Sequence, residues 1–321
     1  MSDTYFHNYV YSDIKFNKKC YYKYNKSYIF ALKQIRNKVI LIGESSSTRT
    51  DWGLVESGDI IERCLTDGIN PFFQTRKEIS HSIRLQLPPV FLKTKLEAVY
   101  FYGAGCSSTE KKNVVKASLE SHMKSTTYVE SDLLGAARAL LQKEAGIACI
   151  LGTGSNSCYY DGEDIVKNVK SLGYILGDEG SGAAIGKAFL SDCLKGLAPE
   201  KLIEPFYEKY KINADDILDY VYTKPFPNKL LSVLSFYLAE HTEHPYVMNL
   251  LYKNLKSFFE RNVLQYDCHT LPVRFVGSVA KMYAKLLTQI AEELRITIDH
   301  IAENSMEGLV KYHCENVKIN I

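Results

Sequence analysis

The 321-residue chain lacks several patterns that mark common protein classes. Its eight cysteines include no CxxC pair, which argues against a zinc site and, at this length, against a disulfide framework. No apolar run approaches the roughly 18 residues of a transmembrane helix. The N-terminal region has no continuous apolar segment of the kind found in a secretory signal. These absences predict a cytoplasmic protein with reduced thiols and no membrane partner.

Two common nucleotide-binding motifs are also absent. The chain contains no GxxxxGK[ST] sequence, the signature of the Walker A phosphate loop, and no GxGxxG follows the first expected strand. A nucleotide site in this chain therefore has to use another phosphate-binding design.

The overall composition is that of a globular protein, with 46% apolar and 24% charged residues, and the length suggests two domains. The net charge of +2 is uneven, because residues 1–38 carry eight Lys or Arg and two Asp, giving +6 there and −4 elsewhere. A basic, tyrosine-rich arm can bind nucleic acid. We favour instead an extension outside the functional fold, with no nucleic-acid partner. Under this hypothesis residues 1–38 are not native, and the functional chain begins near Val39.

The most informative local pattern is an apolar run that stops at small polar residues. Residues 147–151 predict a buried strand, the turn 152–156 follows at once, and residues 157–160 favour a second strand. Residues 39–42 and 44–50 repeat the pattern ahead of a strand that starts at Trp52. Small side chains leave backbone N–H groups uncovered, and converging N–H groups bind anions. Two such hairpins facing each other predict a polyphosphate site, whereas either turn alone could be an ordinary tight hairpin.

Other strands and helices surround these turns. Residues 98–102 and 273–276 read as buried strands, each ending at glycine, and residues 177–182 form a polar turn that opens a helix. Residues 185–265 look largely helical, and a single helix is expected over 279–294. Mixed strands and helices predict α/β layers, in which ligands sit beyond the ends of the strands.

Together these motifs resemble the sugar kinase, Hsp70 and actin superfamily. Within it, they resemble the N-acetylglucosamine kinase branch of the BadF/BadG/BcrA/BcrD-type ATPases. The segments that carry the resemblance are 44–52, 68–71, Asp132 before a small-residue helix, 151–156, 177–181 and 277–279. The most specific part is GTGSN followed about twenty residues later by GDEGS.

The resemblance covers the chain from about Val39 onward and implies a fold. It implies α/β architecture, with two ribonuclease-H-like (actin-like ATPase) domains flanking a central nucleotide and sugar cleft. The N-terminal domain is expected at residues 39–130 and the C-terminal domain at 131–321, with a helical insert at about 185–265. The last helix is expected to cross back to the first domain. The apolar surface of the insert could support a homodimer.

Matching positions imply an ATP- and Mg²⁺-dependent kinase for N-acetylglucosamine or a related amino sugar, a small-molecule partner. The implied nucleotide-binding residues are Ser46, Ser47, Thr48, Arg49, Gly152, Thr153, Gly154, Ser155, Gly277 and Ser278. The implied sugar contacts are Asn70, Gly173, Asp178 and Glu179. Glu44 would reach water-bound Mg²⁺. For Glu179, a plain helix N-terminal acid is the alternative.

Three departures from the family pattern matter. Glu44 stands where Asp is usual, and Ser46 stands where glycine is usual, which would disfavour a positive φ there. The strand end at 103–106, Gly-Ala-Gly-Cys, lacks the carboxylate that serves as catalytic base in the human-type kinase. Asp132 is our candidate for that base, and its alternative role is to cap the helix that follows.

Two other functions remain open. One is a BadF-type ATPase or activator without sugar kinase activity; in activators of this family cysteines hold a [4Fe–4S] cluster. Cys106 has no second cysteine nearby in the sequence, so we interpret it as a small buried residue. The other is a sugar-binding regulator with weak catalysis, suggested by Glu44, Ser46 and the missing carboxylate.

Overall fold

The computed structural model describes residues 38–211 and 213–315 of the chain. Val39–Ile321 forms one compact unit, and the predicted extension at residues 1–38 lies outside the described residues except for Lys38. In the described ranges, no helix combines the length and apolarity needed to cross a membrane.

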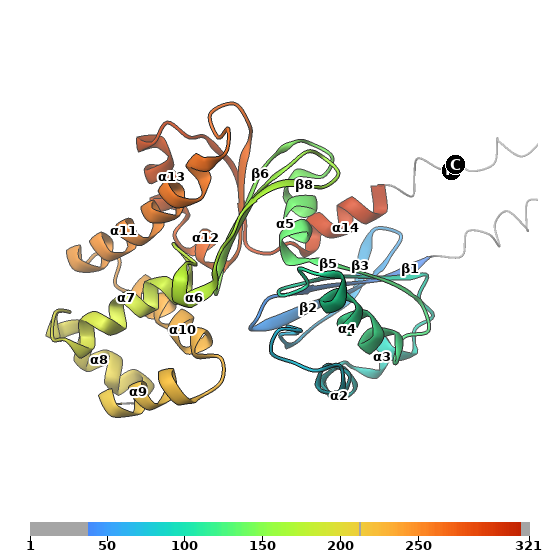
Figure 1. The fold of residues 1–321 in the computed structure, drawn as a ribbon, viewed down its shortest axis with the longest axis horizontal. Helices are drawn as coiled ribbons and strands as arrows, with labels where there is room; N and C mark the ends of the chain where they lie inside the picture. Colours follow the sequence, from blue (N-terminus) through green and yellow to red (C-terminus); the bar gives the residue numbers. More distant parts are fainter. Residues whose placement is uncertain (1–37, 212, 316–321) are drawn as a thin grey trace, which may run out of the picture. The chain divides into compact units, whose positions relative to one another are not determined.

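The first sheet begins with an antiparallel meander and continues with two parallel strands (Figure 1). Its strands, in the order β3-β2-β1-β4-β5, are β1 (Val39–Ser45), β2 (Arg49–Glu56), β3 (Asp59–Asp67), β4 (Ala98–Gly103) and β5 (Thr126–Ser131). β4 runs parallel to β1, and β5 runs parallel to β4. The carboxyl ends of β1, β4 and β5 therefore lie at one edge. The strands expected at residues 39–42, from Trp52 onward and at residues 98–102 are present, and each extends beyond its expected bounds.

Alternating side chains of β1 direct the packing of this sheet. Leu41 belongs to a core shared with three helices, whereas Ile42 contacts the core formed with the C-terminal helix α14 (Met306–Glu315). The three helices are α2 (Arg76–Gln86), α3 (Pro89–Lys93) and α4 (Thr109–Glu120). Trp52 is completely buried in the first of these cores.

The second sheet repeats the pattern of the first. Its strands, in the order β10-β9-β6-β7-β8, are β6 (Gly146–Leu151), β7 (Ser155–Tyr160), β8 (Ile165–Val169), β9 (Val273–Val276) and β10 (Ile298–Ala302). β6 pairs antiparallel with β7 and parallel with β9, as β1 pairs with β2 and β4. The edge strands β8 and β10 were not predicted, because their largely exposed residues form no apolar run.

Helix α5 (Asp132–Leu141) packs on the second sheet through Leu133, Leu140 and their neighbours. On the first sheet, Gly135 of the same helix lies against Tyr102 of β4. Helix α14 follows β10 of the second sheet and contacts β1 and β2 of the first, as expected for the last helix. The domain limits 39–130 and 131–321 remain a prediction, since α5 contacts strands of both sheets.

The other face of the second sheet carries the long helices. They are α7 (Gly182–Leu194), α8 (Glu200–Tyr210), α9 (Ala214–Thr223), α10 (Pro227–Ala239) and α11 (Pro245–Arg261). The largely helical character predicted for 185–265 is therefore confirmed. The single helix expected at 279–294 is wrong: α12 (Ser278–Met282) and α13 (Ala284–Glu293) are separated at Tyr283.

Candidate active site

The two predicted phosphate turns meet in the structure. The first connects β1 to β2 and the second connects β6 to β7. The side-chain hydroxyls of Thr48 and Thr153, one from each turn, lie 3.4 Å apart. The expectation that the two hairpins face each other is therefore correct.

The first turn is held by its own serine. Ser46 Oγ accepts hydrogen bonds from the backbone N–H groups of Thr48 and Arg49, each at 3.2 Å. The Ser46 N–H in turn donates to the Arg49 carbonyl at 3.0 Å. Ser46 does not adopt a positive φ. This agrees with the expectation that serine disfavours a positive φ at this position, and the Ser46 hydroxyl shapes the turn instead.

The second turn is built against the start of α7. The N–H groups of Gly182 and Ala183 donate to the carbonyls of Gly152 and Thr153, at 2.9 and 3.1 Å. Ser181 caps the helix, so the GDEGS motif ends in the helix start that was predicted. The two residues that follow the motif therefore support the turn directly.

Several backbone N–H groups remain available in the two turns. Within residues 38–211 and 213–315, the N–H groups of Ser47, Thr153 and Gly154 have no hydrogen-bond acceptor. Gly152 has no heavy atom within 4 Å of the position that a Cβ would occupy. Free N–H groups beside open space are the arrangement that an anion such as a phosphate needs.

Gly277 lies between the second turn and strand β10. Its φ is +128°, and a Cβ there would lie 2.2 Å from the Leu151 carbonyl oxygen, so only glycine fits. Its N–H donates to the Ala302 carbonyl of β10 at 3.1 Å. The contact of Gly277 and Ser278 with adenosine stays a prediction.

Three carboxylates in the segments around the turns have raised pKa values. Burial raises the pKa of Glu44 to about 7, helped by the negative charges of Asp132 and Asp51. Burial likewise raises the pKa values of Asp132 and Asp178, each to about 6. The charge of Asp132 acts on both Glu44 and Asp178. Carboxylates shifted in this way are typical of functional sites.

Asp132 is not the N-cap of helix α5. Ser131 is the N-cap of α5, and its Oγ accepts a hydrogen bond from the Leu134 N–H at 3.2 Å. Asp132 is the first helical residue, and its Oδ1 accepts from the Leu133 N–H at 2.9 Å. The alternative interpretation of Asp132 as an N-cap was therefore wrong.

Asp178 links the GDEGS motif to the GTGS turn. It is 8% exposed, and its Oδ1 accepts a hydrogen bond from the Ser155 N–H at 3.2 Å. A Cβ at Gly154 would lie 3.0 Å from Asp178 Oδ2. Its own N–H donates to the Ser171 carbonyl at 2.9 Å, which closes a loop that carries Gly173. Asp178 is thus hydrogen-bonded both to the second turn and to the loop that carries Gly173.

Asn70 connects the first turn with the end of β4. Its Nδ2 donates to Ser47 Oγ at 3.2 Å, and its Oδ1 accepts from the Phe72 N–H at 3.0 Å. A Cβ at Gly105 would lie 2.2 Å from Asn70 Oδ1. Asn70 thus contacts both the first turn and the segment that follows β4.

Cys106 behaves as a packing residue. It is fully buried, and burial raises the pKa of its thiol to about 12, with a further contribution from Asp132. The strand end at 103–106 has no carboxylate of its own, but Asp132 and Glu130 both lie near it.

Glu179 lies in a groove between α7 and α11. Its Oε1 pairs with Arg261 Nε at 2.6 Å, and it lines a groove of about 390 Å³ together with Lys187. It lies two residues before the N-cap Ser181, just outside the first turn of α7, so its role as a helix N-terminal acid stays an alternative. Its contact with a sugar stays a prediction.

Two residues were missed by the sequence analysis. Asp51 lies directly opposite Glu44 in the β1–β2 pair, and Arg63 of β3 binds Asp51. The expected second strand began at Trp52, which left Asp51 in the turn. A hairpin register extended by three residues would have placed it opposite Glu44.

Glu44 has no preformed metal cage around it. In the described part of the chain, no three His, Cys, Asp or Glu side chains are grouped closely enough to hold a metal ion. Mg²⁺ commonly binds through one or two carboxylates, with waters and phosphates completing its coordination. The donors present fit Mg²⁺ bound in that manner.

Comparison with solved structures shows the family of this chain. No family model and no curated protein matches the chain. The solved structure of a candidate N-acetylglucosamine kinase from Porphyromonas gingivalis is 44% identical, with a TM-score of 0.83. The match covers 87% of this chain and 99% of that one. The chain belongs to this N-acetylglucosamine kinase-like family. The resemblance drawn from the motifs is confirmed.

More distant structures match in fold alone. A candidate N-acetylglucosamine kinase from Chromobacterium violaceum is 16% identical, with a TM-score of 0.62 over 86% of this chain and 99% of that one. A ROK family glucokinase from Streptomyces griseus, solved with glucose and AMPPNP, is 14% identical, with a TM-score of 0.58. That match covers 85% of this chain and 97% of the glucokinase. The N-acetylglucosamine kinase-like family thus has the α/β fold of the actin-like ATPases, as predicted.

Proposed function

We propose that this protein is an ATP- and Mg²⁺-dependent kinase of the cytoplasm that phosphorylates N-acetylglucosamine or a related N-acetylated hexosamine. The observation that carries the proposal is the meeting of the hydroxyl-rich first turn and the glycine-rich second turn at Thr48 and Thr153, beside the raised-pKa carboxylate of Asp132. The relationship to the Porphyromonas gingivalis protein supports the substrate class.

The two turns would hold the phosphates of ATP from opposite sides. The hydroxyls of Ser46, Ser47 and Thr48 and the side chain of Arg49 belong to the first turn. The second turn offers the free N–H groups of Thr153 and Gly154, together with Gly152 and Ser155. Gly277 and Ser278, beside the second turn, would lie along the adenosine.

Mg²⁺, when bound, neutralises charge on the phosphates. Glu44 would hold its water shell. The pKa of this carboxylate is raised by burial and by neighbouring negative charges, and a nearby cation would relieve both effects.

The sugar would be held by Asn70, Gly173, Asp178 and Glu179, with Asp132 at the attacking hydroxyl. The hydroxyl oxygen bonds to the γ-phosphorus, the bond from that phosphorus to the ADP oxygen breaks, and the hydroxyl proton moves to Asp132. The resemblance implies the 6-hydroxyl. A pKa of about 6 suits a base at neutral pH, because the carboxylate is mostly ionised yet can take up a proton.

A coupled ADP-release assay tests the proposal. The sugars to compare are N-acetylglucosamine, N-acetylmuramic acid, N-acetylmannosamine, glucosamine and glucose, each with ATP and Mg²⁺. ADP release that depends on an N-acetylated sugar is the expected result. Turnover without sugar would instead support an ATPase or activator, and sugar binding without turnover would support a regulator.

A further inference from the structure

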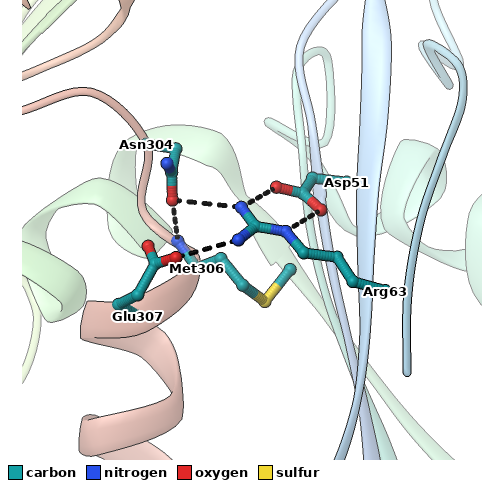
Figure 2. Close-up of polar contacts among 5 residues, drawn as sticks. All are labelled: Asp51, Arg63, Asn304, Met306 and Glu307. Carbon is teal, nitrogen blue, oxygen red and sulfur yellow. Dashed lines mark hydrogen bonds and ion pairs between the residues drawn. The ribbon is translucent and has the colours of Figure 1, made fainter. Parts of the chain in front are cut away.

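Arg63 of β3 joins the first sheet to the segment that arrives from the second sheet (Figure 2). Its guanidinium grips Asp51 of β2 at both carboxylate oxygens, with Nε–Oδ1 and Nη2–Oδ2 distances of 3.0 and 2.6 Å. On its other side, Nη1 donates to Glu307 Oε1 at 2.9 Å and Nη2 donates to Asn304 Oδ1 at 3.4 Å. One side chain thus binds residues more than 240 positions apart in the chain.

Two partners of Arg63, Asn304 and Glu307, lie at the start of helix α14. Asn304 Oδ1 also accepts from the Met306 N–H at 3.2 Å, and Glu307 lies in the first turn of α14, so Arg63 holds the start of that helix. Met306 is fully buried and fills the space beside Gly53, where a Cβ would lie 3.0 Å from its sulfur. Arg63 pairs directly with Gly53 across the β2–β3 ladder. Strand β2, Arg63 and the start of α14 therefore pack against one another. We call this group of contacts the joint.

A continuous path of contacts runs through this joint between the two phosphate turns. Gly277, beside the second turn, donates its N–H to Ala302 at the end of β10. The chain continues from Ala302 to Asn304 and Glu307, which Arg63 binds. Arg63 then grips Asp51, the residue opposite Glu44 next to the first turn.

We propose that Arg63 is a positioning residue that aligns the two phosphate turns by locking the start of α14 to strand β2. The inference rests on the proposed function, because it assumes a nucleotide held by both turns. A bidentate arginine suits this task, since its planar fork fixes direction as well as distance. Such a lock alters nucleotide affinity by holding the binding geometry, without touching the nucleotide.

The decisive variant is Glu307→Gln. It removes the charged link to α14 and leaves the paired Asp51, so the charge around Glu44 is hardly changed. Arg63→Met removes both links and leaves Asp51 buried and unpaired. The measurements are calorimetric titration with ADP and Mg²⁺ at 25 °C, together with melting curves that establish the folded fraction.

Arg274 offers a matched control. It also uses three partners, with Nε–Asp299 Oδ2 at 2.7 Å, Nη2–Glu144 Oε2 at 2.6 Å and Nη1–Leu140 O at 3.0 Å. All of these belong to the second sheet or to α5 and the turn after it. Arg274→Met should therefore lower the melting temperature and leave ADP affinity unchanged.

Arg63→Met is expected to weaken ADP binding about fivefold or more, and Glu307→Gln about two- to fivefold, at temperatures where both remain folded. Unchanged ADP affinity in both variants, with a lowered melting temperature, would overturn the proposal and make Arg63 a purely structural residue. If Arg63→Met does not fold, Glu307→Gln decides alone.

The wild-type protein separates this inference from the proposed function. Wild type that binds ADP but phosphorylates no sugar contradicts the kinase and leaves the ADP comparison decisive for Arg63. Wild type that binds no ADP contradicts both.

Discussion

Thr48 Oγ1 and Thr153 Oγ1 lie 3.4 Å apart, although 105 residues separate them in the chain. Each hydroxyl belongs to a turn between two antiparallel strands, and each hairpin starts a sheet of the same strand pattern. The contact brings the two phosphate turns together in one site.

Asp132→Asn should abolish most turnover and leave the fold intact. The amide oxygen can still accept from the Leu133 N–H, and Ser131 still caps α5, so the helix start is preserved. Loss of a general base typically costs about 10²–10⁴-fold in rate. The measurement is kcat in the ADP-release assay, with ADP affinity as the control that should not change. A loss below tenfold would assign the proton to another group.

The rate should fall on the acidic side of neutrality. A base works only when ionised, and burial raises the pKa of Asp132 to about 6, beside Glu44 at about 7. Activity is therefore present above these values and lost as the pH falls through them. For a pKa of about 6, the ionised fraction at pH 5 is about tenfold below the plateau.

The profile of kcat/KM from pH 5 to 9 checks this expectation. The acidic limb belongs to the interacting pair of carboxylates rather than to either residue alone. Melting temperatures at each pH exclude unfolding as its cause. A flat profile down to pH 5 would contradict the assignment of either group to the reaction.

Two glycine substitutions should separate binding from folding. At Gly152 a methyl group meets no atom within 4 Å, so Gly152→Ala should change the free energy of unfolding by less than about 0.5 kcal/mol. If phosphates occupy that space, the KM for ATP should rise clearly. At Gly277 the methyl group would collide with the Leu151 carbonyl, so Gly277→Ala should lower the melting temperature.

The glycine pair is checked by melting curves and by ATP saturation curves. An unaltered KM for ATP in a well-folded Gly152→Ala protein would argue that the second turn is only a tight hairpin.

Asp178→Asn should weaken sugar use while nucleotide binding persists. The Asn Oδ1 can still accept from the Ser155 N–H, so the second turn should keep its shape. The charge that would accept from sugar hydroxyls is lost, and a hydrogen bond to a charged group is worth about 1.5–3 kcal/mol. The KM for the sugar should therefore rise about tenfold or more, while ADP affinity measured by calorimetry stays unchanged. Equal losses in both would indicate that Asp178 only supports the turn.

Much of the fold could be predicted from the sequence because the signals for strands and turns are local. The apolar runs that stop at Gly43 and Gly152 are visible in consecutive residues, and the structure ends β1 two residues after Gly43 and β6 one residue before Gly152. Edge strands β8 and β10 escaped prediction because one-sided, exposed strands carry no such run. The N-cap of α5 was missed because Ser131 and Asp132 are both good caps, and only backbone geometry chooses between them.

By itself, the sequence determined the two small-residue turns, the α/β class and the segments that would hold a nucleotide and a sugar. The turns and the class follow from side-chain size and polarity along short stretches, and the nucleotide and sugar segments follow from the resemblance of the motifs to the kinase family. Only the tertiary structure decided that Thr48 meets Thr153, that Asp132 acts on both Glu44 and Asp178, and that Arg63 reaches Glu307. Such contacts depend on how two sheets and a returning helix pack, and no local pattern records a distance across hundreds of residues.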